Sequence, residues 1–327
     1  MPPHARAGQV GRGHRFAAYA QCSADNGGSD VTGQRMVAAS AGVAAVICIG
    51  MYLAVGSLVV APAHGRVPPP PAYLHAQYLA LASASGSKLA AWLLVPDAPI
   101  GAVALLHGVR ANRSDMLPRA ELLWHSGYVV LVPDLQSHGE STGDRITFGY
   151  LESRDAEACL LYLREHFPGL HVGGVGVSLG GAALVLAGDR GRSEAAVLEA
   201  VFPTIAEATD NRLAMRIGGL SRVLTPLLLF QLRPRLGIGV EDLRPIESIK
   251  QLRYPVLILA GTADHHTTEA QTRALFAAAN DPKELWLVPG ASHDDLLRFD
   301  ARGYATHVIG FLDRNLARGA TGGRTRG

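Results

Sequence analysis

Three side chains in this sequence have the types that nucleophilic catalysis needs: a serine, an aspartate and a histidine, in that chain order. Ser178 lies in the pentapeptide GVSLG, which fits the pattern G-x-S-x-G. Asp264 follows the apolar run PVLILAG, and His293 follows the run KELWLVPG. A serine hydroxyl becomes a strong nucleophile when a histidine takes its proton and a carboxylate orients that histidine. The pattern therefore predicts Ser178 as nucleophile, His293 as base and Asp264 as the orienter of the base.

The residues around Ser178 predict a sharp turn between a strand and a helix. The apolar run VGGV precedes the serine, and an alanine- and leucine-rich run follows it. Glycines two residues before and after the serine let strand and helix approach closely, and the turn leaves the hydroxyl exposed. A glycine-rich phosphate loop fits poorly, because neither G-x-G-x-x-G nor a Gly-Lys-Ser/Thr sequence is present.

Acyl transfer also needs backbone N–H groups that stabilise a developing oxyanion. We expect one from Leu179, the residue after the nucleophile, at a helix N-terminus where the dipole also favours negative charge. The other is expected from Val109, in the loop that follows AVALLHG. His107 and Gly108 shape that loop, and His107 is expected to bond to backbone without transferring a proton.

Several other polar residues compete for these roles. Glu199, at the end of the run AAVLEA, is the rival acid, although a buried glutamate at a strand end more often ties down its neighbours. His265 and His266 are interpreted as loop residues. The loop PDLQSHGES, residues 133–141, is expected to organise the site from below. In this loop, Asp134, His138 and Glu140 are expected to have structural rather than catalytic roles.

The elements that must position these residues follow an alternating pattern. Short apolar runs such as YVVLVPD and PVLILAG alternate with helical runs such as DAEACLLYLREHF. Buried strands that alternate with helices predict a parallel sheet covered on both faces. Open sheets of this kind place their sites at the carboxyl ends of the strands. The apolar helical segment at about 203–249 is too long for a plain crossover and predicts a small helical cap.

The N-terminal part predicts a different environment. Residues 1–35 show no apolar period and are expected to form a disordered tail. Residues 36–61 contain about 25 consecutive residues without charge, enough for a bilayer-spanning helix or an uncleaved signal anchor. Residues 62–72 include RVPPPP, which is typical of a stiff linker. The globular domain is expected over 73–316, and residues 317–327 as a second disordered tail.

The residues that flank this segment predict its orientation and bear on whether it is cleaved. Arginines lie mainly on its N-terminal side, Arg35 nearest, whereas only Arg66 follows closely. The positive-inside tendency then places the tail in the cytoplasm and the domain outside. A secretory signal is the alternative, because APA at 61–63 resembles a cleavage site, but the apolar run exceeds the length of a typical signal core.

Charge and cysteine content argue against a nucleic-acid-binding protein and against a cysteine metal site. The 30 basic and 28 acidic residues give a net charge of +2, and no basic stripe with interleaved aromatic residues indicates nucleic acid binding. The three cysteines, Cys22, Cys48 and Cys159, show no metal-type spacing and are interpreted as structural thiols.

The chain resembles serine hydrolases of the α/β-hydrolase fold. The resemblance rests on LLHG at 105–108, PDLQSHGES, GVSLGG at 176–181, GTAD at 261–264 and GASH at 290–293. It is closest to membrane-anchored or exported esterases and prolyl-oligopeptidase-like hydrolases. The resemblance implies a mostly parallel eight-stranded sheet with helices on both faces, a helical cap after the sixth strand, and no cofactor or metal. It also implies the Ser178–His293–Asp264 assignment.

The expected activity is hydrolysis of a small-molecule carboxylic ester through an acyl-enzyme. A peptidase, an amidase or a thioesterase with the same triad is an alternative. A non-catalytic, membrane-tethered binding protein on the same fold is another. The leucine-rich cap suggests an apolar acyl pocket, although leucines on such a helix most often pack on the core.

Overall fold

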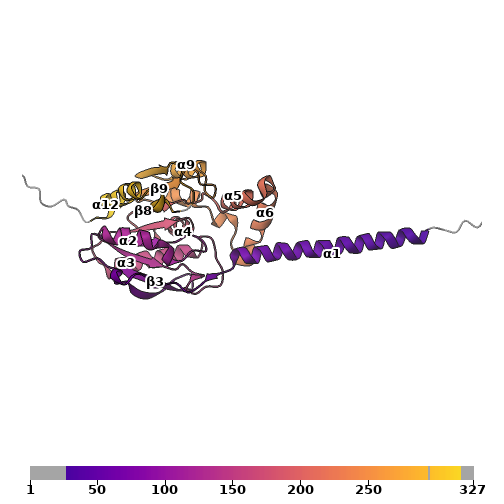
Figure 1. Ribbon diagram of the computed structural model, residues 1–327, viewed down its shortest axis with the longest axis horizontal. Coiled ribbons are helices and arrows are strands. Elements are labelled where there is room, and N and C mark those ends of the chain that lie inside the picture. The colour runs from indigo at the N-terminus through magenta and orange to yellow at the C-terminus, as the bar shows by residue number, and fades with distance from the viewer. Residues whose placement is uncertain (1–26, 294, 318–327) are drawn as a thin grey trace, which may run out of the picture. The chain divides into compact units, whose positions relative to one another are not determined.

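The computed structural model describes residues 27–293 and 295–317. The chain divides into two compact units, Met1–Leu53 and Ala54–Gly327, and the second is called the sheet domain below. The described part of the first unit belongs to the long helix α1, Gly27–Val60, whose last residues belong to the sheet domain (Figure 1). The terminal residues 1–26 and 318–327 of the two predicted tails lie outside the described residues.

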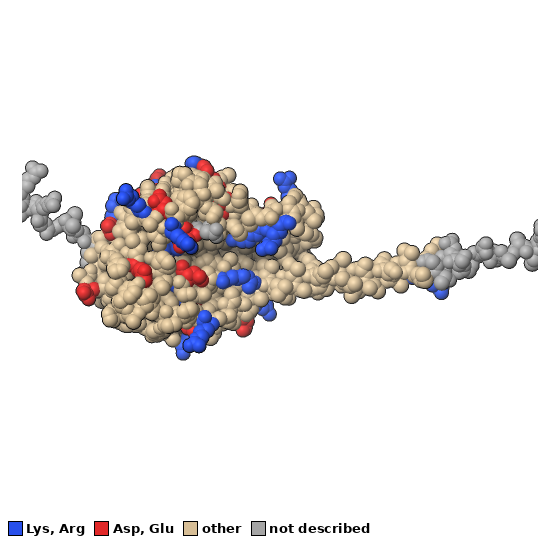
Figure 2. Space-filling model, in the orientation of Figure 1, with Lys and Arg blue, Asp and Glu red and all other residues tan. Residues whose placement is uncertain are grey.

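Helix α1 contains the predicted apolar span. Its segment Gln34–Val60 has a mean hydropathy of 2.5 and is long and apolar enough to cross a membrane. Residues 36–60 carry no Lys, Arg, Asp or Glu, and Figure 2 shows this surface in tan alone. The helix begins at Gly27, nine residues before the predicted span. The predicted disordered tail over 1–35 was therefore wrong for residues 27–35, because a helix can continue beyond its apolar segment; the membrane span at 36–61 stays a prediction.

Eight strands form one sheet in the order β10-β9-β8-β7-β4-β5-β3-β2. Strand β3 runs antiparallel to both of its neighbours, and all the other pairs are parallel. The predicted mostly parallel eight-stranded sheet is thus confirmed. The strands of this sheet are β2 Gln77–Ala82, β3 Lys88–Leu94, β4 Gly101–Leu106, β5 Tyr128–Pro133, β7 Val172–Val177, β8 Ala196–Glu199, β9 Val256–Gly261 and β10 Lys283–Val288.

Helices cover both faces of this sheet, because its central strands are apolar on both sides. Along β4, Ala102, Ala104 and Leu106 join one core cluster, whereas Val103 and Leu105 join the other. The first cluster includes residues of α3, α4 and α9, and the second includes residues of α2, α10, α11 and α12. The bounds are α2 Leu117–His125, α3 Glu152–His166, α4 Leu179–Ala187, α9 Glu269–Ala278, α10 Leu296–Phe299, α11 Ala301–Tyr304 and α12 Gly310–Leu316.

The remaining helices lie between β8 and β9 in the chain, where the cap was predicted. They are α5 Ile205–Ile217, α6 Ser221–Phe230, α7 Leu232–Leu236 and α8 Pro245–Ser248. The segment Ile205–Leu236 also has the length and composition of a membrane span, with a mean hydropathy of 1.4. However, α5 and α6 pack against each other, so this segment folds back on itself (Figure 1).

The residues predicted as a free linker are attached to the sheet domain. Strand β1, Ala63–His64, pairs in parallel with β6, His138–Gly139. Val67 is buried in a core cluster, and its N–H donates to Glu140 Oε1 at 3.2 Å. The stiff-spacer interpretation was therefore wrong for residues 63–67. Apolar burial and backbone pairing hold them, and composition alone does not reveal either contact.

Candidate active site

Ser178 stands at a sharp turn between β7 and α4. Its backbone angles are φ 49° and ψ −106°, a conformation that costs energy for any residue except glycine. Its N–H donates to the backbone oxygen of Glu199 at 2.8 Å, and its own carbonyl accepts from Ala182 N at 2.9 Å. These bonds hold the strained residue in place, while its side chain borders a cavity.

The glycines of the pentapeptide make this turn possible. A Cβ at Gly176 would lie 2.4 Å from Gly181 N, and one at Gly180 would lie 2.4 Å from the backbone oxygen of Leu106. No real Cβ approaches backbone atoms so closely, so only glycine lets α4 pass this near to β7 and β4.

The predicted base and acid contact each other. His293 Nδ1 lies 2.7 Å from Asp264 Oδ2, and Asp264 is 3% exposed. The other carboxylate oxygen, Oδ1, accepts from the N–H groups of His266 at 2.7 Å and Thr267 at 2.9 Å. Three donors thus fix a carboxylate that can orient His293 and stabilise a positive charge on its ring.

The two loops that carry this pair meet because a glycine ends β9. A Cβ at Gly261 would lie 2.1 Å from the backbone oxygen of Ala291. Ala263 N–H donates to the same oxygen at 2.9 Å. The loop after β10 therefore rests on the end of β9, which brings His293 to Asp264.

Ser178 and His293 are not joined by a hydrogen bond among the residues that the structure describes. A ligand-free site often has such bonds long and tightens them when substrate binds. The His266 ring fills part of this region: its centroid lies 4.6 Å from that of His293, and it lines the same cavity as Ser178. His266 is a site residue that the sequence interpretation left in the loop. Its place two residues after Asp264 was the available signal.

Val109 and Leu179 both line the cavity beside Ser178. Within residues 27–293 and 295–317, neither backbone N–H donates a hydrogen bond. Leu179 begins helix α4, where the first N–H groups have no partner inside the helix. A Cβ at Gly108 would lie 3.8 Å from Ser178 Cβ, so the loop after β4 passes directly beside the serine. Both N–H groups are thus available to a ligand oxygen.

Glu199, the rival acid, faces a different part of the protein. Its side chain is 1% exposed and forms an ion pair with Arg119 of α2, and Tyr304 Oη donates to Glu199 Oε2 at 3.1 Å. Its backbone oxygen, and not its carboxylate, accepts the hydrogen bond from Ser178 N–H. The glutamate therefore links strand β8 to helices α2 and α11.

The loop below the site forms a charged network. Asp134 accepts from the N–H groups of Arg113 at 2.7 Å and Glu140 at 2.8 Å, and the Arg113 guanidinium pairs with both carboxylates. His107 is fully buried: its Nε2 accepts from Leu135 N–H at 3.0 Å, and its Nδ1 lies 2.7 Å from the Gly108 oxygen. Burial lowers the pKa of His107 to about 3, so the ring stays neutral and shapes the loop.

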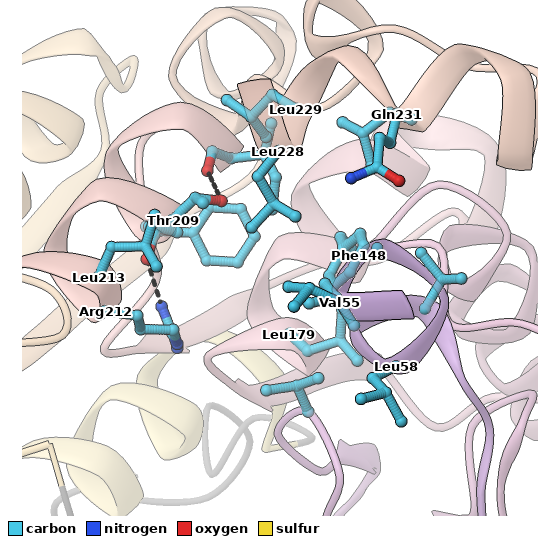
Figure 3. A pocket seen from close by; sticks show the side chains of 18 of the residues that line it. Val55, Leu58, Phe148, Leu179, Thr209, Arg212, Leu213, Leu228, Leu229 and Gln231 are labelled. Carbon is cyan, nitrogen blue, oxygen red and sulfur yellow. Dashed lines mark hydrogen bonds between the residues drawn. The ribbon is translucent and has the colours of Figure 1, made fainter. Parts of the chain in front are cut away.

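Ser178 lies at the edge of an apolar cavity of about 540 Å³. Figure 3 shows Thr209, Arg212 and Leu213 of α5 on one side of it, and Val55 and Leu58 of α1 on the other. This volume is typical of a small-molecule site. Burial lowers the pKa of the Arg212 guanidinium, and the nearby Asp264 carboxylate opposes that shift. Over the described ranges, no cluster of three His, Cys, Asp or Glu side chains has the geometry of a metal site.

Comparisons with known proteins agree with this architecture. The chain is 25% identical to the uncharacterised protein YqkD of Bacillus subtilis over 71% of its length and 77% of that protein. It is 26% identical to the uncharacterised protein Rv2307c of Mycobacterium tuberculosis, over 83% of this chain and 92% of that protein. The fold resembles that of the Pyrococcus furiosus esterase Pf2001, with a TM-score of 0.64 and 20% identity over 78% of this chain and 100% of the esterase.

A family model extends this agreement from single relatives to a whole family. The model for the alpha/beta hydrolase family matches residues 103–306, which include the turn at Ser178 and the loops of Asp264 and His293. The chain belongs to the alpha/beta hydrolase family.

Proposed function

We propose that this hydrolase cleaves a carboxylic ester through an acyl-enzyme formed on Ser178. The observation that carries the proposal is the 2.7 Å contact between His293 and Asp264, two residues from different strand ends. The strained turn at Ser178 adds to it. The structural similarity to an esterase supports the fold of this protein and does not identify its substrate.

The reaction follows from the groups at the edge of the cavity. Ser178 Oγ attacks the ester carbonyl while His293 Nε2 takes its proton, and Asp264 keeps the proton on Nδ1 and stabilises the imidazolium. The N–H groups of Leu179 and Val109 donate to the oxyanion. His293 returns its proton to the leaving alkoxide, so an alcohol departs. Water then gives a proton to His293 and attacks the acyl-enzyme. The acid is released as His293 passes that proton to Ser178 Oγ, which restores the serine.

Replacement of the nucleophile tests this function. We expect Ser178→Ala to lower kcat for p-nitrophenyl butyrate by about 10⁶-fold, with only binding and oxyanion effects left. Thr209 lines the same cavity, so Thr209→Ala serves as a control that changes the cavity and keeps the triad. Equal turnover by the parent and Ser178→Ala would end the proposal. Matched ester, thioester and amide substrates would define the leaving group.

We also propose that residues 36–61 anchor the chain as a single membrane span with the sheet domain outside the cytoplasm. The apolar segment Gln34–Val60 and the position of Arg35 on its N-terminal side support this topology. Protease added to intact spheroplasts should degrade a C-terminal epitope tag. A tag that is protected until the membrane is permeabilised would reverse the orientation. A tag found in the soluble fraction would indicate a cleaved signal.

A further inference from the structure

The cavity beside Ser178 has the end of α1 as one of its walls. Val55, Leu58 and Val60 line it, all within the sheet domain. A Cβ at Gly56 would lie 2.1 Å from Gln231 Oε1, so the helix backbone packs directly on that side chain. The last turns of α1 therefore contact Gln231, the residue that directly precedes α7.

Two arginines form hydrogen bonds with the last turns of α1. Arg235 Nη1 donates to Ser57 Oγ at 2.7 Å. Arg110 Nη2 donates to the carbonyl oxygens of Leu58 and, at 3.3 Å, of Val59. A guanidinium at the C-terminal carbonyls of a helix also complements the helix dipole. The end of α1 is thus an integral part of the cavity.

The proposed membrane anchor at 36–61 overlaps the cavity wall, and the apolar segment is longer than a bilayer crossing needs. A helix rises 1.5 Å per residue, so the roughly 20 residues from Gln34 to Leu53 span about 30 Å, the thickness of a bilayer's hydrocarbon core. The segment from Ala54 to Val60 is not needed for the crossing. In a chain anchored by this span, the cavity wall lies at the membrane interface.

Several large apolar side chains on and just before helix α6 are exposed. Phe230 is 79% exposed, and its neighbours on this face are also exposed. Their spacing of three to four residues places them on one side of the helix. We call this surface the α6 face; it consists of Leu220, Val223, Leu224, Leu227 and Phe230. Phe230 directly precedes Gln231, which contacts the cavity wall at Gly56. An exposed apolar surface beside a wall that continues into a membrane anchor is suited to contact with lipid.

Positive charge accompanies this apolar surface. Arg110, Arg212 and Arg216 line the cavity and form no ion pair within the described residues, and no aspartate or glutamate is among the lining residues. Figure 2 shows basic side chains, in blue, on the visible face of the cap. Arg212 also lies near the Asp264 carboxylate, but three guanidinium groups against this one carboxylate still favour an anionic ligand group such as a phosphate.

We infer, on the basis of the proposed ester hydrolysis, that the substrate is an acyl ester of an anionic amphiphile drawn from a lipid surface. Its acyl chain lies between the last turns of α1 and helices α5 and α6, and its anionic group meets the cavity arginines. The α6 face rests on the same lipid. Water adds across the acyl C–O bond and releases a fatty acid and the alcohol that carries the anionic group.

The first test compares substrates that differ in charge and chain length. The full chain, reconstituted in phosphatidylcholine nanodiscs, is given 1-palmitoyl-lysophosphatidylglycerol, 1-palmitoylglycerol or p-nitrophenyl butyrate. We expect kcat/KM for the anionic palmitoyl ester to exceed that for the neutral one by at least about 10-fold, as an added charged hydrogen bond supplies. Turnover of butyrate without this preference would overturn the inference and leave the proposed function intact. No turnover of any ester would overturn both.

Two pairs of substitutions then test which arginines cause the preference for the anionic substrate. Arg212→Gln/Arg216→Gln should bring the ratio of anionic to neutral rates close to one. Arg253→Gln/Arg302→Gln, which removes two exposed charges outside the cavity lining, should keep the parental ratio. A ratio unchanged by the cavity pair, or lowered equally by both pairs, would contradict a headgroup site at these arginines.

Chain-length preference tests the apolar part. Leu228→Trp places a larger side chain in the cavity and should lower the ratio of palmitoyl to butyryl rates by about 10-fold or more. Val240→Trp, a partly exposed cap position outside the lining, should keep that ratio. An unchanged ratio in the Leu228 variant would remove the acyl chain from this cavity.

The contact with lipid has a readout that does not depend on activity. In vesicles of brominated phosphatidylcholine, Phe230→Trp should add tryptophan emission that bromine quenches, whereas Val240→Trp should add emission that bromine quenches much less. The native tryptophans are common to both variants and are subtracted. Equal quenching of the two added signals would show that the α6 face does not rest on lipid.

Discussion

The carboxyl edge of the sheet and the cap are built on opposite principles. At the sheet edge, glycines allow backbone segments to touch: a Cβ would lie 2.4 Å from backbone at Gly180 and 2.1 Å at Gly261. In the cap, a Cβ at Gly219 would have no atom within 4 Å. The geometry of the proposed reaction thus depends on backbone packing that tolerates no change. At Gly219 the cap leaves room for a side chain.

The largest effect after loss of the nucleophile should come from the acid. Asp264→Asn should keep the fold and lower kcat by about 10⁴-fold, because an amide no longer stabilises the imidazolium or its tautomer. Steady-state ester hydrolysis and circular dichroism of the same preparation measure the two effects.

Glu199→Gln provides the matched control for this acid. It should lower the free energy of unfolding by about 2 kcal/mol, because the buried Arg119 loses one charged partner and keeps only the Asp295 carboxylate at 3.0 Å, with little change in kcat of the folded enzyme. A mild effect in Asp264→Asn together with a severe loss of kcat in Glu199→Gln would move the acid to strand β8.

A pair of alanine substitutions compares the two regions directly. Gly180→Ala should lower kcat about 100-fold, because its Cβ can fit only if α4 moves away from Leu106 and displaces Ser178. Gly219→Ala, in the cap, should leave kcat unchanged. Turnover and thermal unfolding of both variants give the comparison. Similar effects at the two positions would break the contrast between a rigid edge and a tolerant cap.

The smallest effect concerns stability in acid. His107 keeps a pKa of about 3 in the folded chain, against about 6.5 when unfolded. The unfolded chain therefore binds the proton first, so this contribution is complete above pH 6.5 and declines as the pH falls toward 3. Between pH 6.5 and 5 the loss is about 2 kcal/mol.

A non-titrating side chain isolates this contribution. His107→Gln can still donate to Gly108 O and accept from Leu135 N–H, and it should have a flatter pH dependence of unfolding. Urea unfolding of the detergent-solubilised chain at pH 5, 6 and 7 provides the measurement. Parallel pH profiles for parent and variant would contradict a buried neutral imidazole.

Much of the sheet edge could be predicted from sequence because local patterns encode it. Apolar runs marked the strands, and the glycines around Ser178 marked the turn. Asp264 and His293 follow consecutive strands, and the structure has a hydrogen bond between them. Their catalytic roles, like those of Val109 and Leu179, stay predictions.

The contacts that sequence patterns did not reveal join distant parts of the chain. The end of α1 looks uniformly apolar, and its role as a cavity wall depends on contacts with Arg110 and Arg235, which lie far away in the sequence. Pairing of Ala63 with His138 involves a two-residue strand too short for any periodicity. The ring contact of His266 with His293 depends on the fold of two loops.

Active-site labelling of the full chain tests the central claim most directly. A fluorescent fluorophosphonate should label the parent, and Ser178→Ala and His293→Ala should lose the label while circular dichroism shows them folded. That result would identify Ser178 as a nucleophile activated by His293. A folded parent that takes no label would contradict a serine hydrolase at this site and favour a membrane-tethered binding protein on the same fold. Equal labelling of the parent and Ser178→Ala would place the reactive nucleophile at another residue and would contradict the role of Ser178.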